Sequence, residues 1–124
     1  MVDPFPNERD LSALWQSACG TSPEPTDFRQ VLSRSLAHIG AYDTTRLVGF
    51  VNVAWDGGIH AIILDTCVHP DYRRRGIATK LAMQAASISR ERGAHWLHVD
   101  FEPHLSELYR KCGFRHTEAG LLRL

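Results

Sequence analysis

A chain of 124 residues, with 44% hydrophobic and 23% charged residues, has the composition of one globular domain with a sizeable core. Its 14 Lys and Arg residues balance its 14 Asp and Glu residues, so the formal net charge is +0. No overall field would draw such a chain to nucleic acid or to an anionic membrane. We therefore expect residues 1–124 to form a single soluble domain that binds neither.

The cysteine pattern and the N-terminal residues indicate where the protein resides. Cys19, Cys67 and Cys112 lie far apart and form no CxxC pair, which favours neither a disulfide framework nor a zinc site. Residues 1–6 hold two prolines and an acid instead of the apolar run of a signal peptide. Apolar runs such as 61–64 are much shorter than the roughly 20 residues of a membrane helix. We expect a cytoplasmic protein.

Two helices are predicted at the start of the chain. Residues 7–18 place apolar side chains on one helical face, and Gly20 follows where a helix commonly ends. After a proline-containing loop, a second helix is expected to begin near Thr26. The apolar stripe of this second helix consists of Phe28, Val31, Leu32 and Leu36.

Three strands are expected next. Residues 37–42 read as a first strand and 43–45 as a turn, and residues 47–55 alternate as a second strand. Asp56-Gly57-Gly58 is a strong hairpin signal. Residues 59–68 are largely apolar, which predicts a central strand that is covered on both faces.

The remaining residues predict alternating helices and strands. A helix is expected over residues 76–92, with Gly93 in the left-handed conformation at its end, and a strand over 96–101. Pro103 opens a short helix, and Phe114 begins a last strand. The order of elements predicts a mixed sheet flanked by helices, an α/β fold with α+β character.

The segment VHPDYRRRGIA, residues 68–78, carries the strongest chemical signal. It joins a predicted strand to a predicted helix, and its three arginines stand where the helix dipole disfavours cations. A bound anion would remove this conflict, because free backbone N–H groups, Gly76 without a Cβ, and Arg73, Arg74 and Arg75 at the rim form a phosphate cradle. The alternative is that these arginines are solvated charges in a turn.

Two further features accompany this loop. The predicted strand over 95–101 should lie beside the strand over 59–68 if the crossover is right-handed. Where two such strands splay apart, unpaired backbone groups can bond an extended ligand arm. The segment 108–114, LYRKCGF, follows on the next helix.

Together these features resemble the GNAT family of N-acetyltransferases. Arg73 to Ala78 matches the family's [RQ]-x-x-G-x-[GA] signature, after its customary Val68-His69-Pro70. Residues 109–114 resemble its Y-x-K-x-G-F ending. The resemblance covers the chain from about the first predicted helix through Phe114, and it implies a mostly antiparallel central sheet flanked by about four helices, in a short version.

The resemblance implies that the chain moves an acetyl group from acetyl-CoA to a primary amine of a small molecule or peptide by direct attack. The pyrophosphate of coenzyme A would bind the amides of residues 74–78 and the flanking arginines. The pantetheine arm would lie along the strand end, where a backbone N–H near Val68 would polarise the acetyl carbonyl. The implied cosubstrate-binding residues are Cys67, Val68, Arg73, Arg74, Arg75, Gly76, Ile77 and Ala78.

Tyr109 matches the general-acid tyrosine of the family. A phenol with a pKa of about 10 is protonated at neutral pH and can give its proton to a leaving thiolate. The alternative is a core tyrosine, because Leu105, Leu108 and Cys112 share its predicted helix face.

Three features depart from the family pattern. Glu102 stands where many members carry an asparagine, which leaves the contact to the pantetheine arm open. Ile62 stands where some carry a catalytic-base glutamate, which leaves the proton acceptor open. A relay through Asp65, His98 or Asp100 is one alternative, and an acceptor that arrives neutral is another. The family's usual first strand is missing before residue 7, so we expect a second copy of the chain to supply or cover that sheet edge.

Several other residues could suggest a metal site, a nucleophile or an acceptor pocket, but each also has a plainer structural explanation. His95 and His98 face opposite sides of a strand and the remaining histidines have no ligand spacing, so we expect no metal. A buried apolar role is favoured for Cys67 over a nucleophile, and Trp55 could wall an acceptor pocket or simply pack. The residues that could attract a cationic amine, or be solvated charges, are Glu24, Asp27, Glu107 and Glu118.

Two other functions remain as alternatives. The first is a non-catalytic acyl-CoA-binding or regulatory module on the same fold, which the retained Tyr109 disfavours and the missing glutamate favours. The second is nucleic-acid binding through Arg73 to Arg75, which is disfavoured because one short basic cluster lies on a neutral chain without an aromatic platform.

Overall fold

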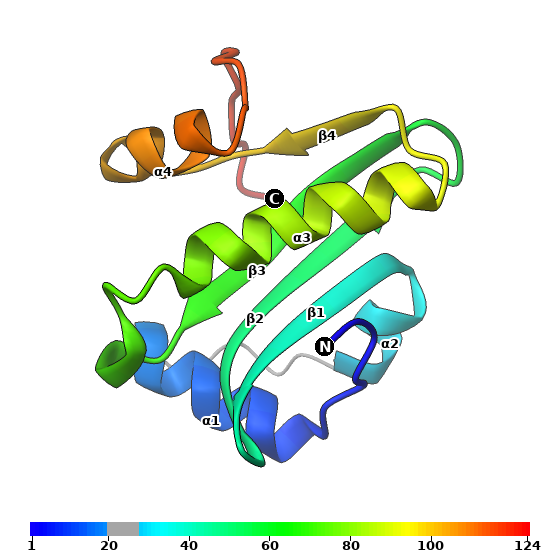
Figure 1. Cartoon of the computed structure of the whole chain (residues 1–124). Helices are drawn as coiled ribbons and strands as arrows, with labels where there is room; N and C mark the ends of the chain where they lie inside the picture. The colour runs from blue at the N-terminus through cyan, green and yellow to red at the C-terminus, as the bar shows by residue number, and fades with distance from the viewer. Residues whose placement is uncertain (20–27) are drawn as a thin grey trace.

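The computed structural model describes residues 1–19 and 28–124 of the chain. Four strands form one sheet in the order β1-β2-β3-β4, in which the first three are antiparallel and β4 runs parallel to β3 (Figure 1). The strands are β1 (Ser35–Asp43), β2 (Arg46–Trp55), β3 (His60–Val68) and β4 (Trp96–Val99). The predicted mixed sheet is confirmed.

Helices cover both faces of this sheet. The longest, α3, crosses one face, and α1 and α2 pack on the other (Figure 1). The α-helices are α1 (Glu8–Cys19), α2 (Phe28–Ser33), α3 (Ile77–Glu91) and α4 (Ser106–Lys111), and short 3-10 turns stand at η1 (Pro70–Tyr72) and η2 (Pro103–Leu105). The first helix begins where its sequence predicts, because the Asn7 side chain accepts a hydrogen bond from the Asp10 N–H at 2.8 Å.

Two apolar clusters form the core, one on each face. The α3 face holds Leu36, Ile39, Val51, Val53, Ala61, Ile63, Leu81, Ala85 and Ala94. The α1 and α2 face holds Leu11, Leu14, Phe28, Leu32, Leu47, Phe50 and Cys67. Every residue of β2 from Leu47 to Val53 is buried, so β2 is the strand that is covered on both faces.

The prediction that residues 59–68 are covered on both faces is therefore wrong. On β3, Leu64 is 41% exposed and His60 is exposed. The helix α1 packs against β2 and the Cys67 end of β3, which leaves the outer face of the first half of β3 without a covering helix among the described residues. The cleft described below is lined by the second half of the strand, from Ile63 to Val68.

The predicted last strand is also wrong. The structure assigns no strand to residues 114–124. Phe114 packs against the α3 cluster, but Leu121 and Leu122 are 91% and 84% exposed. The residues between them are polar, charged or small, so no alternating apolar face holds this segment against the sheet.

Two further element ends differ from the predicted ones. The second helix ends at Ser33, and Leu36 belongs to β1. β4 ends at Val99, two residues before Phe101. The predicted start of the second helix near Thr26, and Gly20, lie outside the described residues.

The N-terminal residues run along β1 in place of a full first strand. Val2 forms a single antiparallel bridge with Ile39, and the Asp3 N–H donates to the His38 carbonyl at 2.7 Å. These contacts cover part of the outer β1 edge. Among residues 1–19 and 28–124, no helix is long and apolar enough to cross a membrane.

Candidate functional site

A cleft opens where β3 and β4 separate. The two strands pair only from His60 with Trp96 to Ile63 with Val99. β3 then continues to Val68, while the chain after β4 turns away into η2 and α4 (Figure 1). The resulting cleft has a volume of about 1180 Å³. Its walls are residues 63–68, residues 99–102, one face of α4, and residues 116–119 of the C-terminal segment.

The end of β3 presents its backbone to this cleft. The His69 N–H donates to the Val48 carbonyl at 2.8 Å, so these two residues form a hydrogen-bonded pair. Antiparallel ladders alternate, which makes the next pair, Gly49 with Val68, a non-hydrogen-bonded one. The N–H and C=O of Val68 therefore point away from β2, toward the space that β4 has left.

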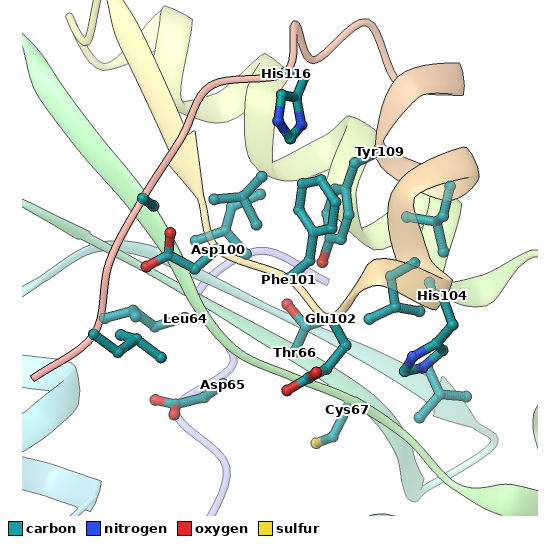
Figure 2. Close-up of a pocket in the computed structure, with 18 of the residues that line it drawn as sticks. Leu64, Asp65, Thr66, Cys67, Asp100, Phe101, Glu102, His104, Tyr109 and His116 are labelled. Carbon is teal, nitrogen blue, oxygen red and sulfur yellow. The ribbon is translucent and has the colours of Figure 1, made fainter. Parts of the chain in front are cut away.

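A β-bulge shapes the same strand. Asn52 pairs with Leu64 and Phe50 with Cys67, so Asp65 and Thr66 both lie opposite Val51. Asp65 has a φ of +57°, which is rare for a residue with a Cβ. Its side chain lines the cleft (Figure 2). Burial raises the pKa of Asp65, and a hydrogen bond from Asn52 partly offsets this rise.

The loop before α3 is built to receive an anion. Arg74 and Gly76 are both left-handed, with φ values of +64° and +76°. Gly76 precedes the first residue of α3, and no side chain in the described part of the chain caps this helix start. The first backbone N–H groups of α3 therefore remain available for a ligand. A Cβ on Gly76 would meet nothing within 4 Å, so its surface is open.

The three arginines have different surroundings. The Arg73 guanidinium donates to the Ala18 carbonyl at 2.9 Å, and Arg73 lines the cleft. The Arg75 guanidinium lies 5.0 Å from the centre of the Tyr72 ring. Arg74 is exposed and has no side-chain partner within residues 1–19 and 28–124. It is the arginine that can turn toward a bound phosphate without breaking a contact.

Tyr109 stands on the opposite wall of the cleft (Figure 2). Its ring stacks on Phe101 at 4.9 Å and meets the edge of Phe114 at 5.6 Å, and the residue is 5% exposed. Burial raises the pKa of Tyr109 above its usual 10, although a hydrogen bond with Thr66 acts in the opposite direction. The phenol is thus protonated at neutral pH, and Tyr109 both packs in the core and lines the cleft.

The structure brings most of the sequence-predicted site residues to this one cleft. Cys67 is 7% exposed and belongs to the α1 core cluster, and it also lines the cleft with Val68 and Ala78. Ile77 packs against the α3 cluster instead. Arg74, Arg75 and Gly76 lie in the loop between two cleft residues, Arg73 and Ala78.

The candidates for proton relay and for amine binding separate into two groups. Asp65, Asp100, Glu102 and Glu118 line the cleft. His98 does not line it and lies 3.1 Å from His60, nitrogen to nitrogen. Glu107 pairs with Arg110 at 2.7 Å, and Trp55 is also outside the cleft lining. Glu24 and Asp27 lie outside the described residues.

Sequence reasoning missed three parts of the site. Thr66 and Phe101 flank Tyr109, and residues 116–119, of which only Glu118 is a candidate from the sequence, close one wall. Phe101 was assigned to the strand, and the polar tail carries no motif. No group of three or more potential metal ligands occurs within residues 1–19 and 28–124.

Known proteins share this fold. A GNAT-family acetyltransferase from Streptococcus pneumoniae superposes with a TM-score of 0.83 at 24% identity, over 100% of this chain and 95% of that one. The structure of AAC(6')-Iy in complex with a bisubstrate analog, CoA-S-monomethyl-acetylneamine, has a TM-score of 0.70 at 17% identity, over 94% and 89% of the two chains. At these identities the likeness shows the fold.

Sequence similarity extends over most of the chain. A mycothiol acetyltransferase from Mycolicibacterium vanbaalenii is 32% identical over 103 residues, which make up 82% of this chain and 34% of that protein. The chain spans less than half the length of the curated relatives it matches. The model of the Acetyltransferase (GNAT) family matches residues 7–114, from the start of α1 to the residue that follows Gly113. The chain therefore belongs to the GNAT family of acetyltransferases.

Proposed function

We propose that the chain is an N-acetyltransferase that moves an acetyl group from acetyl-CoA to a primary amine of a small molecule or a peptide. One observation carries this proposal: a single cleft connects the anion-receptive loop at the start of α3 with the buried phenol of Tyr109. The CoA conjugate bound by AAC(6')-Iy, which has the same fold, supports acetyl-CoA as the cosubstrate. The cysteine pattern supports a cytoplasmic setting.

The loop and the end of β3 would hold the cosubstrate. The backbone N–H groups of residues 74–78 and the Arg74 guanidinium would bind the pyrophosphate, since both are available to an anion. The pantetheine arm would lie along Cys67 and Val68 as an added strand. The inward N–H of Val68 would then donate to the acetyl carbonyl and make its carbon more electrophilic.

This arrangement supports direct transfer without a covalent enzyme intermediate. The free amine attacks the acetyl carbon, a C–N bond forms, and the C–S bond of the thioester breaks. Tyr109 gives its phenolic proton to the departing thiolate, and its raised pKa ensures that this proton is present at neutral pH. We assign Cys67 a packing role and not that of a nucleophile, because its side chain belongs to the α1 core cluster.

Replacing Tyr109 by Phe tests the proposal. Thiol release from acetyl-CoA is measured with a panel of primary amines that includes diamines, amino sugars and peptides. We expect one class of amine to stimulate release, and Tyr109→Phe to lower kcat on the order of 100-fold. The matched control is Tyr42→Phe, because Tyr42 packs near the α1 cluster and lies outside the cleft lining.

Two results would contradict the proposal. Acetyl-CoA binding without thiol release for any amine would favour a non-catalytic acyl-CoA-binding module. Equal rates for Tyr109→Phe and Tyr42→Phe would remove Tyr109 from the chemistry and leave it as a core residue.

A further inference from the structure

We propose that Asp65 accepts the proton of the acceptor ammonium group, and that the buried side chains of Asn52 and Ser35 hold its carboxylate in position. The inference rests on the proposed function and adds a residue that the family resemblance leaves open. Ile62, at the position of the family's base, carries no titratable group, so a proton acceptor supplied by this chain has to stand elsewhere.

The backbone delivers Asp65 to the site. The bulge on β3 inserts the extra residue at Asp65–Thr66, and Asp65, which has a left-handed φ of +57°, is among the residues that line the cleft, as is Tyr109. Residues with a Cβ hold such a conformation only where their surroundings fix it. Thr66, the other residue of the bulge, is hydrogen-bonded to Tyr109. The bulge thus places Asp65, the proposed proton acceptor, next to Thr66, which is hydrogen-bonded to Tyr109, the proposed proton donor.

Asn52 holds the carboxylate from below the cleft. It is 2% exposed in a strand whose other buried residues, 47–53, are apolar or glycine. A buried amide is costly unless both of its ends are hydrogen-bonded. Its oxygen lies 2.7 Å from the Ser35 hydroxyl, and its other end, the NH₂ group, is hydrogen-bonded to Asp65. Ser35, Asn52 and Asp65 therefore form a polar chain from β1 through the sheet to the cleft.

The hydroxyl of Ser35 allows two arrangements of this chain. It carries one hydrogen and has three acceptors nearby: the Ala37 carbonyl at 2.6 Å, the Asn52 amide oxygen at 2.7 Å and the Val53 carbonyl at 3.1 Å. When the Ser35 hydroxyl donates to the Asn52 amide oxygen, the amide NH₂ group faces Asp65 and can donate to its carboxylate. When the Ser35 hydroxyl donates to the Ala37 carbonyl instead, the Asn52 amide can turn over. Its NH₂ group would then donate to the Ser35 oxygen, and its own oxygen would face a protonated Asp65. The first arrangement is the one that favours the carboxylate, because the hydrogen bond from Asn52 lowers the pKa of Asp65.

The electrostatic setting also suits a proton acceptor. Burial, the larger effect, moves the pKa of Asp65 toward neutral pH, where a base is most effective. The titratable and charged groups that face the same cleft are Cys67 on β3, Asp100 and Glu102 after β4, His104 of η2, Tyr109 of α4, His116 and Glu118 of the C-terminal segment, and Arg73 of the loop. Most of the charged ones are acids, which favour a cationic amine in the cleft.

The protons balance over one turnover. The ammonium group loses one proton to the Asp65 carboxylate, and the free amine forms the C–N bond. Tyr109 protonates the thiolate as the C–S bond breaks. The attacking nitrogen, now bonded to the acetyl carbon, then loses a second proton, which restores the Tyr109 phenol. The proton on Asp65 leaves to water through the open cleft, so each turnover releases one proton.

A titration of the Asp65 carboxyl by carbon NMR tests the inference directly. The Asp65 signal is identified by its absence in Asp65→Asn, and its midpoint is compared among wild type, Asn52→Leu and Ser35→Ala. We expect the midpoint to rise by about one unit in Asn52→Leu, which lacks the donor, and by less in Ser35→Ala. The acidic limb of the kcat/KM profile should move with it, so that activity below the midpoint falls about tenfold and recovers at higher pH.

Glu91→Gln is the matched control, because it removes an exposed carboxylate of α3 that lies outside the cleft lining and should leave the position of the acidic limb unchanged. An Asp65 midpoint that is the same in all folded variants would overturn the role of Asn52 and Ser35. An unchanged acidic limb in Asp65→Asn would overturn the role of Asp65 itself. If Asn52→Leu does not fold, the Asp65 midpoint in Ser35→Ala decides, because Ser35 is only half-buried. If no amine is acetylated, the proposed function fails, and the NMR midpoints still decide whether Asn52 and Ser35 hold the carboxylate.

Discussion

At the scale of single residues, His38 ties the N-terminal segment to the sheet. It is 1% exposed, and its Nε2 accepts a hydrogen bond from the Phe5 N–H at 2.9 Å. Accepting this bond requires a neutral ring. Asp3 adds a 2.7 Å ion pair to Arg92, which in turn donates to the Leu36 carbonyl. The N-terminal segment, β1 and the end of α3 thus meet at one buried imidazole.

Stability should therefore depend on pH through His38. Burial, the larger effect, lowers the pKa of His38 below 6.5, although Asp3 raises it in part. The unfolded chain then binds a proton at a higher pH than the folded one, so the free energy of unfolding falls as pH drops below about 6.5. Urea unfolding at pH 7.5, 6.5 and 5.5 should show this loss in wild type and a smaller one in His38→Gln.

The comparison of the two proteins isolates His38. Asp65, whose pKa is raised, gains a proton in the folded state first and acts in the opposite direction at acidic pH, but it is present in both proteins. Parallel curves for wild type and His38→Gln would show that the imidazole is not the titrating group.

Residues with local signals could be predicted from the sequence, and residues with distant partners could not. Arg73 to Gly76 and Tyr109 stand in short motifs, and the structure places them at the ends of one cleft. Asn52 and His38 are buried polar residues in apolar strands, which signals that a partner exists but not which one. Their partners come from the bulge of β3 and from the N-terminal segment, and these positions depend on the tertiary fold.

At the scale of elements, two glycines end or begin helices in the left-handed conformation, and they serve different purposes. Gly76 precedes α3 with φ +76°, and Gly93 follows its C-terminal end with φ +101°. A Cβ on either would meet nothing within 4 Å. Gly76→Ala and Gly93→Ala should therefore each lower the free energy of unfolding by about 1–2 kcal/mol through the backbone alone.

Only Gly76→Ala should also weaken acetyl-CoA binding, because only Gly76 lies in the proposed phosphate loop. Gly93→Ala is thus a control with matched backbone strain. Denaturant unfolding and acetyl-CoA titration of both variants check this expectation. Equal losses of affinity in the two variants would mean that general destabilisation, not the loop, affects binding.

The order of the helices and strands could be predicted from the periodicity of the sequence, but which faces of each strand are covered by helices could not. The alternation in residues 47–55 predicts a strand, and β2 is found there, yet it is buried on both faces because α3 and α1 pack on opposite sides. The apolar run of β3 predicts burial, but its outer face is partly open because α1 reaches only its second half. The motif that ends at Phe114 favours a strand from there on, but the polar residues that follow form no strand.

At the scale of the whole molecule, α3 connects the sheet to the site. Its apolar stripe packs on β1, β2 and β3, so its first turn is fixed relative to the end of β3. Gly49 allows this approach, since a Cβ there would lie 3.1 Å from the Ile77 side chain. The anion-receptive loop, the inward backbone of Val68 and the Tyr109 phenol are thus held by one packed unit, and Asp65 lines the same cleft.

Calorimetric titration of the folded protein with acetyl-CoA shows whether the loop before α3 holds the cosubstrate. The variants are Arg74→Glu, which reverses the available charge in the loop, and Arg90→Glu, which makes the same change at the other end of α3. We predict saturable binding by wild type and Arg90→Glu, and at least about tenfold weaker binding by Arg74→Glu. No binding by folded wild type, or equal affinities for both variants, would contradict an acetyl-CoA site in this loop.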